Sequence, residues 1–126
     1  MTIEFPHLLP RHDAEADLMI QEEILVDTHD DEKLAAWYTY LEGALPFPFS
    51  AMVLTEQKAN TTMYSMVRLE KLAPLERCAN RQIWVLGRLS INDKPLLHFF
   101  LADLKSVNKL EAYQPVYNWK YWLNRK

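Results

Sequence analysis

The chain has 126 residues, of which 49% are hydrophobic and 12% aromatic, so it is long enough for one domain with a core and too short for two. Its net charge of −3 is unevenly distributed, because residues 1–32 hold ten acidic side chains against Arg11 alone, a net −9, and the remainder carries +6. A single cysteine, Cys78, excludes an internal disulfide and a cysteine-rich zinc site, and the longest apolar run, Pro95–Leu104, is well short of the roughly 20 residues that span a membrane. We therefore expect one cytoplasmic domain, residues 1–126, with no membrane partner.

Residues 1–21 are interpreted as an acidic N-terminal arm with little periodicity. One short helical piece is predicted from Ala14 to Ile20, packed by Leu18 and Met19. An acidic arm of this kind can bind cations, keep the protein in solution, or fold over the chain's own basic second half. The composition leaves these roles open.

The next segment predicts a short strand followed by an amphipathic helix. Ile24–Val26 is a β-favouring run, and Thr28 and Asp31 have the spacing of a capping box, which predicts that a helix starts there. Gly43, near the end of the helix, permits the left-handed residue that often closes one. The apolar face of the helix is predicted from side chains at helical spacing: Leu34, Trp37, Tyr38, Leu41 and Leu45.

Pro46 and Pro48 are expected to turn the chain into a sheet, because each fixes its own backbone angle and biases the preceding residue toward extended geometry. Alternating patterns then predict strands over Phe49–Glu56 and Met63–Glu70, joined by a polar turn. A third and a fourth run follow, separated by a turn at Asn92–Lys94, and their shared-face residues are Ile83, Val85, Leu89 and Ile91, then Leu97, Phe99 and Leu101.

A final helix is predicted from Pro115 to Asn124, because proline is tolerated in the first turn of a helix. Val116, Trp119 and Leu123 share one face of it, and neighbouring aromatic residues should cap the sheet rather than receive a ligand. With no helix between the strands to make parallel crossovers, the fold class is α+β: a small antiparallel SH3-like barrel or bent sheet flanked by N-terminal and C-terminal helices.

The acids before the first long helix are candidate metal ligands. Asp27, Asp30, Asp31 and Glu32 offer the oxygen atoms that Ca²⁺ prefers, at a chain reversal that can add backbone carbonyls. Their spacing is not that of an EF-hand, since Thr28 and His29 interrupt it and no glycine is present. The same acids also favour the positive end of a helix, so their spacing alone fits capping as well as it fits a metal site.

Other chemistry has little support in the sequence. The four histidines form no ligand-like pair, Cys78 has no histidine near it, and two glycines cannot build a phosphate-binding loop, so an enzyme is not expected. The basic second half, interspersed with Trp84 and tyrosines, is compatible with a protein or nucleic-acid partner, although ordinary solvated faces carry as many charges.

Residues 22–122 resemble the cyanobacterial calcium-binding protein family, small acidic cytoplasmic proteins that bind calcium by surface carboxylates without EF-hands. The matching residues are Glu23–Asp27, Asp31–Glu32, Trp37–Tyr38, Tyr40–Glu42, Leu45, Phe47–Phe49 and Trp119–Trp122. The resemblance implies a role in calcium buffering or signalling. It departs from the family's acidic middle strands, where this chain has Arg68, Lys71, Arg77 and Arg81.

The sequence therefore predicts a non-enzymatic, regulatory calcium-binding protein. The resemblance and the oxygen chemistry together support Asp27, Asp31, Glu32 and Glu42 as ligands, and Asp30 is added by local chemistry alone. The alternative is a metal-independent interaction module that binds a protein or nucleic-acid partner through its basic strands or aromatic tail. The sequence does not decide the oligomeric state.

Overall fold

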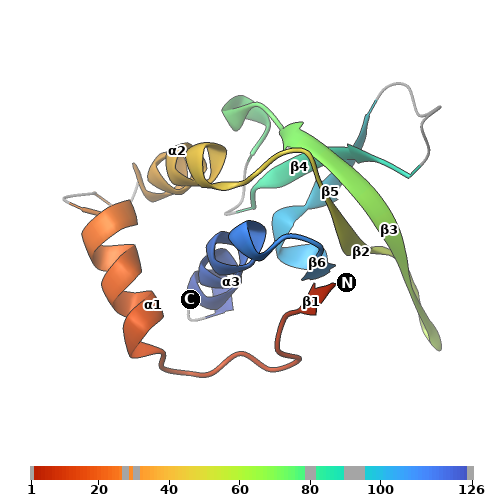
Figure 1. Cartoon of the computed structure of the whole chain (residues 1–126), viewed down its shortest axis with the longest axis horizontal. Coiled ribbons are helices and arrows are strands. Elements are labelled where there is room, and N and C mark those ends of the chain that lie inside the picture. The colour runs from red at the N-terminus through yellow and green to blue at the C-terminus, as the bar shows by residue number, and fades with distance from the viewer. Residues whose placement is uncertain (1, 27–28, 30–31, 79–81, 90–95, 125–126) are drawn as a thin grey trace.

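The computed structural model describes residues 2–26, 29, 32–78, 82–89 and 96–124, without the side chains of residues 56–58. Its helices are α1 (Ala14–Met19), which continues as the π-helix η1 (Ile20–Ile24), α2 (Lys33–Ala44) and α3 (Leu110–Asn124), with short 3₁₀ turns η3 (Leu75–Arg77) and η4 (Leu101–Asp103). Its strands are β1 (Ile3–Glu4), β2 (Phe49–Lys58), β3 (Thr61–Leu72), β4 (Trp84–Arg88), β5 (Leu97–Phe100) and β6 (Leu104–Val107). The helices lie together on one side of the sheet (Figure 1).

The strands form one antiparallel sheet in the order β1-β6-β2-β3-β4-β5. The α+β class with a bent antiparallel sheet and terminal helices is therefore confirmed. The sheet is not closed, because β1 and β5 lie at its two edges and no pairing in the described part of the chain joins them. Of the two predicted alternatives, the closed SH3-like barrel was wrong. β1 and β6 were not predicted, since strands of 2 and 4 residues are too short for a visible alternation.

The alternation predicted for the long hairpin is confirmed where the hairpin covers the core. Ala51 pairs with Val67 and Phe49 with Leu69, and all four side chains are buried. Toward the tip both faces reach solvent, and Met63 is 48% exposed. Leu89 and Leu97, predicted to share the inner faces of the third and fourth runs, are also exposed, because they lie at the sheet margin.

The core between sheet and helices is aromatic. Trp37 of α2 lies with its ring centroid 5.2 Å from that of Trp119 and 5.6 Å from that of Trp122, and the three indoles fill the space between α2 and α3. Trp37, Leu41 and Trp119 are fully buried, as their helical spacing predicts. The aromatic residues of α3 are thus core residues, which confirms their predicted packing role.

Two helix boundaries differ from the predictions. α3 starts at Leu110, five residues earlier than predicted, and Pro115 lies inside it, although proline cannot donate the hydrogen bond of a helix interior. Pro115 is buried, so tertiary packing stabilises what the local rule opposes. α2 continues past Gly43 to Ala44, and Gly43 does not adopt the left-handed conformation.

The N-terminal arm is more helical than predicted. α1 begins at Ala14 as expected, but Ala16 is buried and Leu18 is 56% exposed, so the predicted packing by Leu18 was wrong. The β-favouring run Ile24–Val26 is not a strand: Ile24 ends the π-helix, whose wider turn brings Ile20 and Ile24 into the core. The burial of these two isoleucines prevails over their strand preference.

Candidate functional site

The acidic segment lies between the end of η1 and the start of α2. On its entry side the Leu25 N–H donates to the Ile20 carbonyl at 2.8 Å, and on its exit side the Glu32 N–H donates to the His29 carbonyl at 2.9 Å. Asp27, Asp30 and Asp31, with the predicted cap residue Thr28, lie outside the described residues. The structure therefore gives the two ends of the candidate site.

Glu32 occupies the N-cap position of α2, where an acid commonly binds the free amides of the first turn. Its side chain makes no such cap hydrogen bond and is exposed. The sequence left open whether the acids only cap the helix. Glu32 does not cap it with its side chain. Its carboxylate oxygens remain accessible to an ion.

Glu42 lies far from Glu32 although both were predicted as ligands. The two residues are ten positions apart along α2, which corresponds to about 15 Å at the rise of an α-helix. Ligand oxygens lie about 2.3–2.6 Å from a calcium ion, so this separation does not favour one ion shared by the two carboxylates. Among the described residues, no group of three or more His, Cys, Asp and Glu side chains is placed to hold a metal. A complete site there requires Asp27, Asp30 or Asp31.

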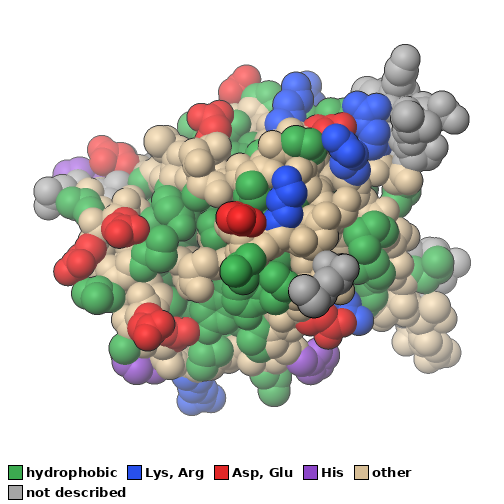
Figure 2. Space-filling model, viewed as in Figure 1, with side chains coloured by type: hydrophobic (Ala, Val, Ile, Leu, Met, Phe, Trp, Pro, Cys, Tyr) green, Lys and Arg blue, Asp and Glu red, His purple; other side chains and the backbone are tan. Residues whose placement is uncertain are grey.

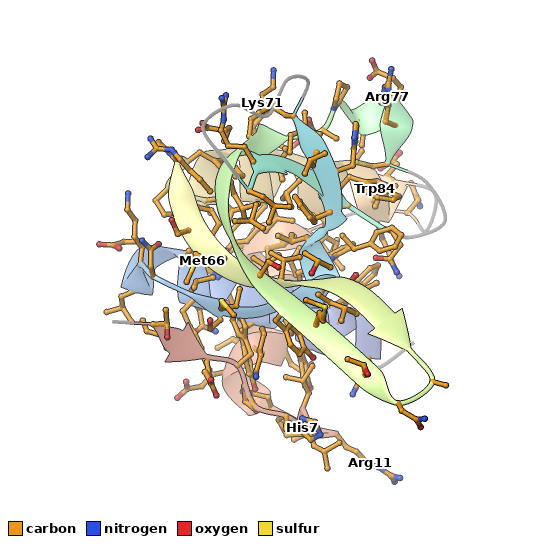
Figure 3. The ribbon with its side chains drawn as sticks, turned by 90° about the vertical axis from the view of Figure 1, so that its right-hand side faces the viewer. His7, Arg11, Met66, Lys71, Arg77 and Trp84 are labelled. Atoms are coloured by element: carbon orange, nitrogen blue, oxygen red, sulfur yellow. The ribbon has the colours of Figure 1, made fainter. Side chains whose placement is uncertain are left out.

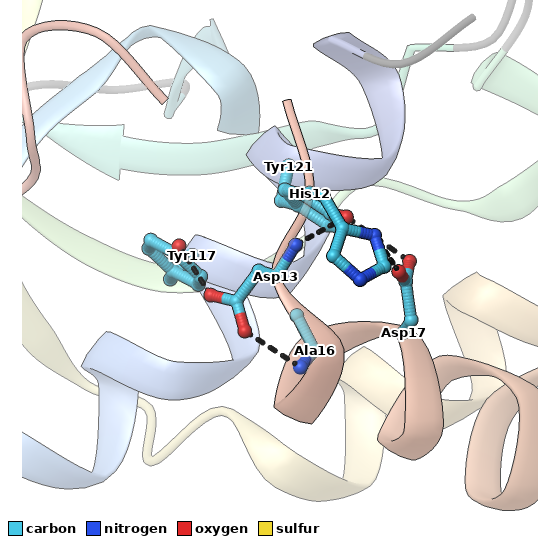
Figure 4. A network of polar contacts seen from close by, with 6 residues as sticks. All are labelled: His12, Asp13, Ala16, Asp17, Tyr117 and Tyr121. Atoms are coloured by element: carbon cyan, nitrogen blue, oxygen red, sulfur yellow. Dashed lines mark hydrogen bonds and ion pairs between the residues drawn. The ribbon is translucent and has the colours of Figure 1, made fainter. Parts of the chain in front are cut away.

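The sequence reasoning missed a polar network that fastens the arm to α3 (Figure 4). The Tyr117 hydroxyl donates to Asp13 Oδ2 at 2.7 Å, and the Tyr121 hydroxyl accepts from the Asp13 N–H at 2.9 Å and donates to Asp17 Oδ1 at 3.1 Å. Asp13 Oδ1 also caps α1 by accepting from the Ala16 N–H, and His12 Nδ1 lies 3.2 Å from Asp17 Oδ2. Tyr117 and Tyr121 are four residues apart, the one sequence cue to a shared helix face.

The network shifts the acidity of its members. The hydrogen bond from Tyr117, followed by that from Ala16, lowers the pKa of Asp13, because both stabilise its charged form. Burial, and then the hydrogen bond to Asp13, raises the pKa of Tyr117. Asp13 is thus held as a carboxylate and Tyr117 as a donor. Since α1 leads through η1 into the acidic segment, and α2 also packs on α3, both ends of that segment are anchored to one helix.

We expect Tyr117→Phe to lower the free energy of unfolding at pH 7 by about 1 kcal/mol, because the half-buried Asp13 carboxylate loses its hydroxyl donor. A depressed folded pKa contributes stability above the ordinary value of 3.8, and this contribution disappears as the pH falls through the lower folded pKa. Denaturant unfolding at pH 7 and pH 3 measures the difference. Tyr113→Phe is the matched control, and equal losses for the two variants at pH 7 would contradict the role of Asp13.

The acidic arm does not cover the basic strands. It lies along α3 and pairs with β6, whereas Lys71 and Arg77 are exposed at the other end of the sheet. Figure 2 shows acidic side chains gathered over α1 and most lysine and arginine side chains toward β3 and β4. The arm therefore does not cover the basic residues of β3 and η3, although it lies beside Lys105 and Lys120. None of the helices in the described part of the chain has the length and apolar character that crossing a membrane requires.

Comparison with known proteins gives a family and two similar structures. The profile of a family described as "Calcium binding", Calci_bind_CcbP, matches residues 19–123. The crystal structure of Anabaena CcbP superposes with a TM-score of 0.78 at 26% identity, covering 90% of this chain and 93% of that one. A structure described as a calcium binding protein in the calcium-binding form gives a TM-score of 0.77 at 26% identity, covering 91% and 94%. No curated protein sequence matches significantly.

Proposed function

Since the chain belongs to the calcium-binding family Calci_bind_CcbP, we propose that it binds Ca²⁺ at the acidic segment between η1 and α2 and acts without enzymatic activity. The proposed ligands are Asp27, Asp30, Asp31 and Glu32. The observation that carries the proposal is the family match itself, because residues 19–123 contain the whole segment. The calcium-binding form of a similar structure supports it.

The residues fit the ion chemically. Ca²⁺ takes six to eight oxygen ligands in flexible geometry, and carboxylates on a chain reversal can be joined by backbone carbonyls and water. Glu32 supports the fit, because its side chain is exposed and makes no cap hydrogen bond. Glu42, about 15 Å further along α2, contributes negative potential rather than a bond to the same ion. When bound, the ion supplies positive charge that joins the two anchored ends of the segment.

The proposed role is calcium buffering or calcium-dependent regulation in the cytoplasm. A ligand that binds only the folded arrangement stabilises it by mass action, so Ca²⁺ would tighten the segment against α3. Calcium binding would then change the contacts of both anchoring helices with α3: those of α1 at Asp13 and those of α2 at Trp37.

The second candidate function is a metal-independent interaction module. The aromatic tail is buried, with Trp119 and Tyr121 fully inaccessible, so we assign this function to the exposed outer face of β2 and β3 instead. Tyr64 and Met66 on this face are 38% and 46% exposed, and Figure 3 shows Met66 and Lys71 on the side away from the helices. Its apolar and basic character favours an acidic protein partner.

Calorimetric titration of Ca²⁺ into chelator-treated protein, in physiological salt with excess Mg²⁺, tests the calcium proposal. We expect saturable binding by the parent despite the excess Mg²⁺, because calcium tolerates an irregular oxygen cage that magnesium does not. Asp27→Asn/Asp31→Asn should lose that binding, because it removes two of the proposed carboxylate ligands. Glu76→Gln/Glu111→Gln removes two exposed acids elsewhere and should bind as the parent does.

Two results would overturn the proposal. If the parent gives no heat while a known calcium binder does so under the same conditions, the acidic segment is not a calcium site and the interaction module is favoured. If the Asp27→Asn/Asp31→Asn variant binds as tightly as the parent, calcium binds elsewhere on the chain.

A further inference from the structure

A polar cavity lies at the opposite end of the arm from the acidic segment. Its volume is about 340 Å³, at the lower end of the range for small-molecule sites. The cavity is lined by Glu4 and His7 of the arm, by Tyr64 of the hairpin, and by Asp103, Lys105 and Lys120. Figure 3 shows His7 on the arm below the sheet, on the side of the β2–β3 tip. The calcium proposal uses none of these residues.

Lys120 provides a fixed positive charge at this cavity. Its Nζ donates to the Leu104 carbonyl at 2.7 Å and to the Ala102 carbonyl at 2.9 Å, and lies 5.2 Å from the ring centroid of Phe5. Burial lowers the pKa of Lys120, and the charge of Asp103 opposes that shift. An ammonium group has three N–H donors, so one remains after the hydrogen bonds to the two carbonyls.

Asp103 provides an opposite charge that the described residues do not satisfy. Its side chain is half-buried, and it makes no hydrogen bond or ion pair within the described part of the chain. Lys120 acts on it through space but donates to the carbonyls instead. The carboxylate oxygens of Asp103 are therefore available to water or to a ligand that occupies the cavity.

The rim repeats the same pairing of charges. Lys105 Nζ lies 4.7 Å above the ring centroid of Tyr64, which holds its ammonium group beside the cavity, and Glu4 approaches from the arm. The cavity thus presents two carboxylates and two ammonium groups. A simple anion would meet Asp103 and Glu4, and a simple cation would meet the two lysines, so neither is matched alone.

We propose that this cavity binds a small zwitterion of the amino-acid class. The ligand's ammonium group would donate to Asp103, with Glu4 nearby, and its carboxylate would accept from Lys105 and the remaining N–H of Lys120. Both unsatisfied features of the cavity are then paired by one molecule. The site is independent of calcium, and failure of either proposal leaves the other standing.

NMR titration of the full chain, followed at the backbone amides of Phe5 and residues 102–105, tests the site with three probes of equal length. The zwitterion 4-aminobutyrate should give saturable shifts, while butyrate and butylamine, each lacking one charge, should bind about tenfold more weakly or not at all. Asp103→Asn and Lys105→Gln should each weaken 4-aminobutyrate by about tenfold. Glu76→Gln and Lys71→Gln, the same changes at exposed positions outside the cavity, should bind as the parent does.

Three outcomes would overturn the proposal: no shift with any probe, equal binding of butyrate and 4-aminobutyrate, or unchanged binding in both cavity variants. Equal binding of butyrate would make the cavity an anion site. Lys105 is exposed, so Lys105→Gln is expected to keep the fold and decides the result even if Asp103→Asn alters the amide spectrum.

Discussion

Trp37→Ala is expected to lower the free energy of unfolding by about 3–5 kcal/mol, the cost of emptying a large aromatic site in a core. Trp37 is fully buried and contacts both indoles of α3, so the cavity would open where α2 and α3 meet. The free energy of unfolding of single domains is only about 5–15 kcal/mol, so Trp37→Ala would remove a large part of the stability. Denaturant unfolding followed by circular dichroism measures the change.

Trp37→Phe is the matched control for the size of the ring. Trp37→Phe should lower the free energy of unfolding much less than Trp37→Ala, because most of the side-chain volume is kept. It also removes the indole N–H, which is buried without a hydrogen-bond partner in the described structure. Equal losses for phenylalanine and alanine would show that the indole ring itself, rather than a filled core, is required. A loss below about 1 kcal/mol for Trp37→Ala would contradict the packing described here.

Gly87→Ala is the second large effect, and its cause is crowding. A Cβ atom at Gly87 would lie 2.7 Å from the Arg68 carbonyl oxygen and 2.8 Å from Val67 Cγ1, both on the neighbouring strand β3. A contact with a backbone oxygen is not relieved by rotating a side chain, so β3 and β4 would have to separate. We expect a loss of about 1–3 kcal/mol in the free energy of unfolding, measured by the same denaturant titration.

Gly43→Ala makes the same chemical change where there is room. Gly43 is exposed inside α2, and a Cβ atom there would meet nothing within 4 Å. Alanine loses less backbone entropy in a helix, so this variant should gain up to about 1 kcal/mol. Opposite signs for the two variants are expected, and stabilisation of both would contradict the close approach of β3 and β4.

Calcium affinity connects these stability tests to the proposed function. The acidic segment is anchored on one side by Asp13 and Tyr117 and on the other by the packing of Trp37 against α3. Variants that loosen either anchor increase the number of conformations that the segment must lose on binding. We therefore expect the calcium affinity, measured on the folded variants, to fall as either anchor is weakened.

The amino-acid sequence by itself determined the features that depend on local periodicity and composition. The helical spacing of Trp37 and Leu41 predicted the buried face of α2, and the alternation from Phe49 predicted the β2–β3 hairpin, because one-sided burial imposes a period on each element. The acidic segment and the family resemblance were also readable from the residues themselves, and the family was confirmed. The assignment of ligands within that segment stays a prediction.

Only the tertiary structure decided the features that depend on distant residues meeting. Ile24 lies in a π-helix and Pro115 in a helix interior because burial in the core prevails over local preference at both positions. Asp13 and Tyr117 are 104 residues apart, and Asp103 meets the arm and α3 at one cavity, so no local pattern marks either site. Side-chain pairing across such separations has no period in the sequence, and packing of the arm against α3 and β6 is what creates it.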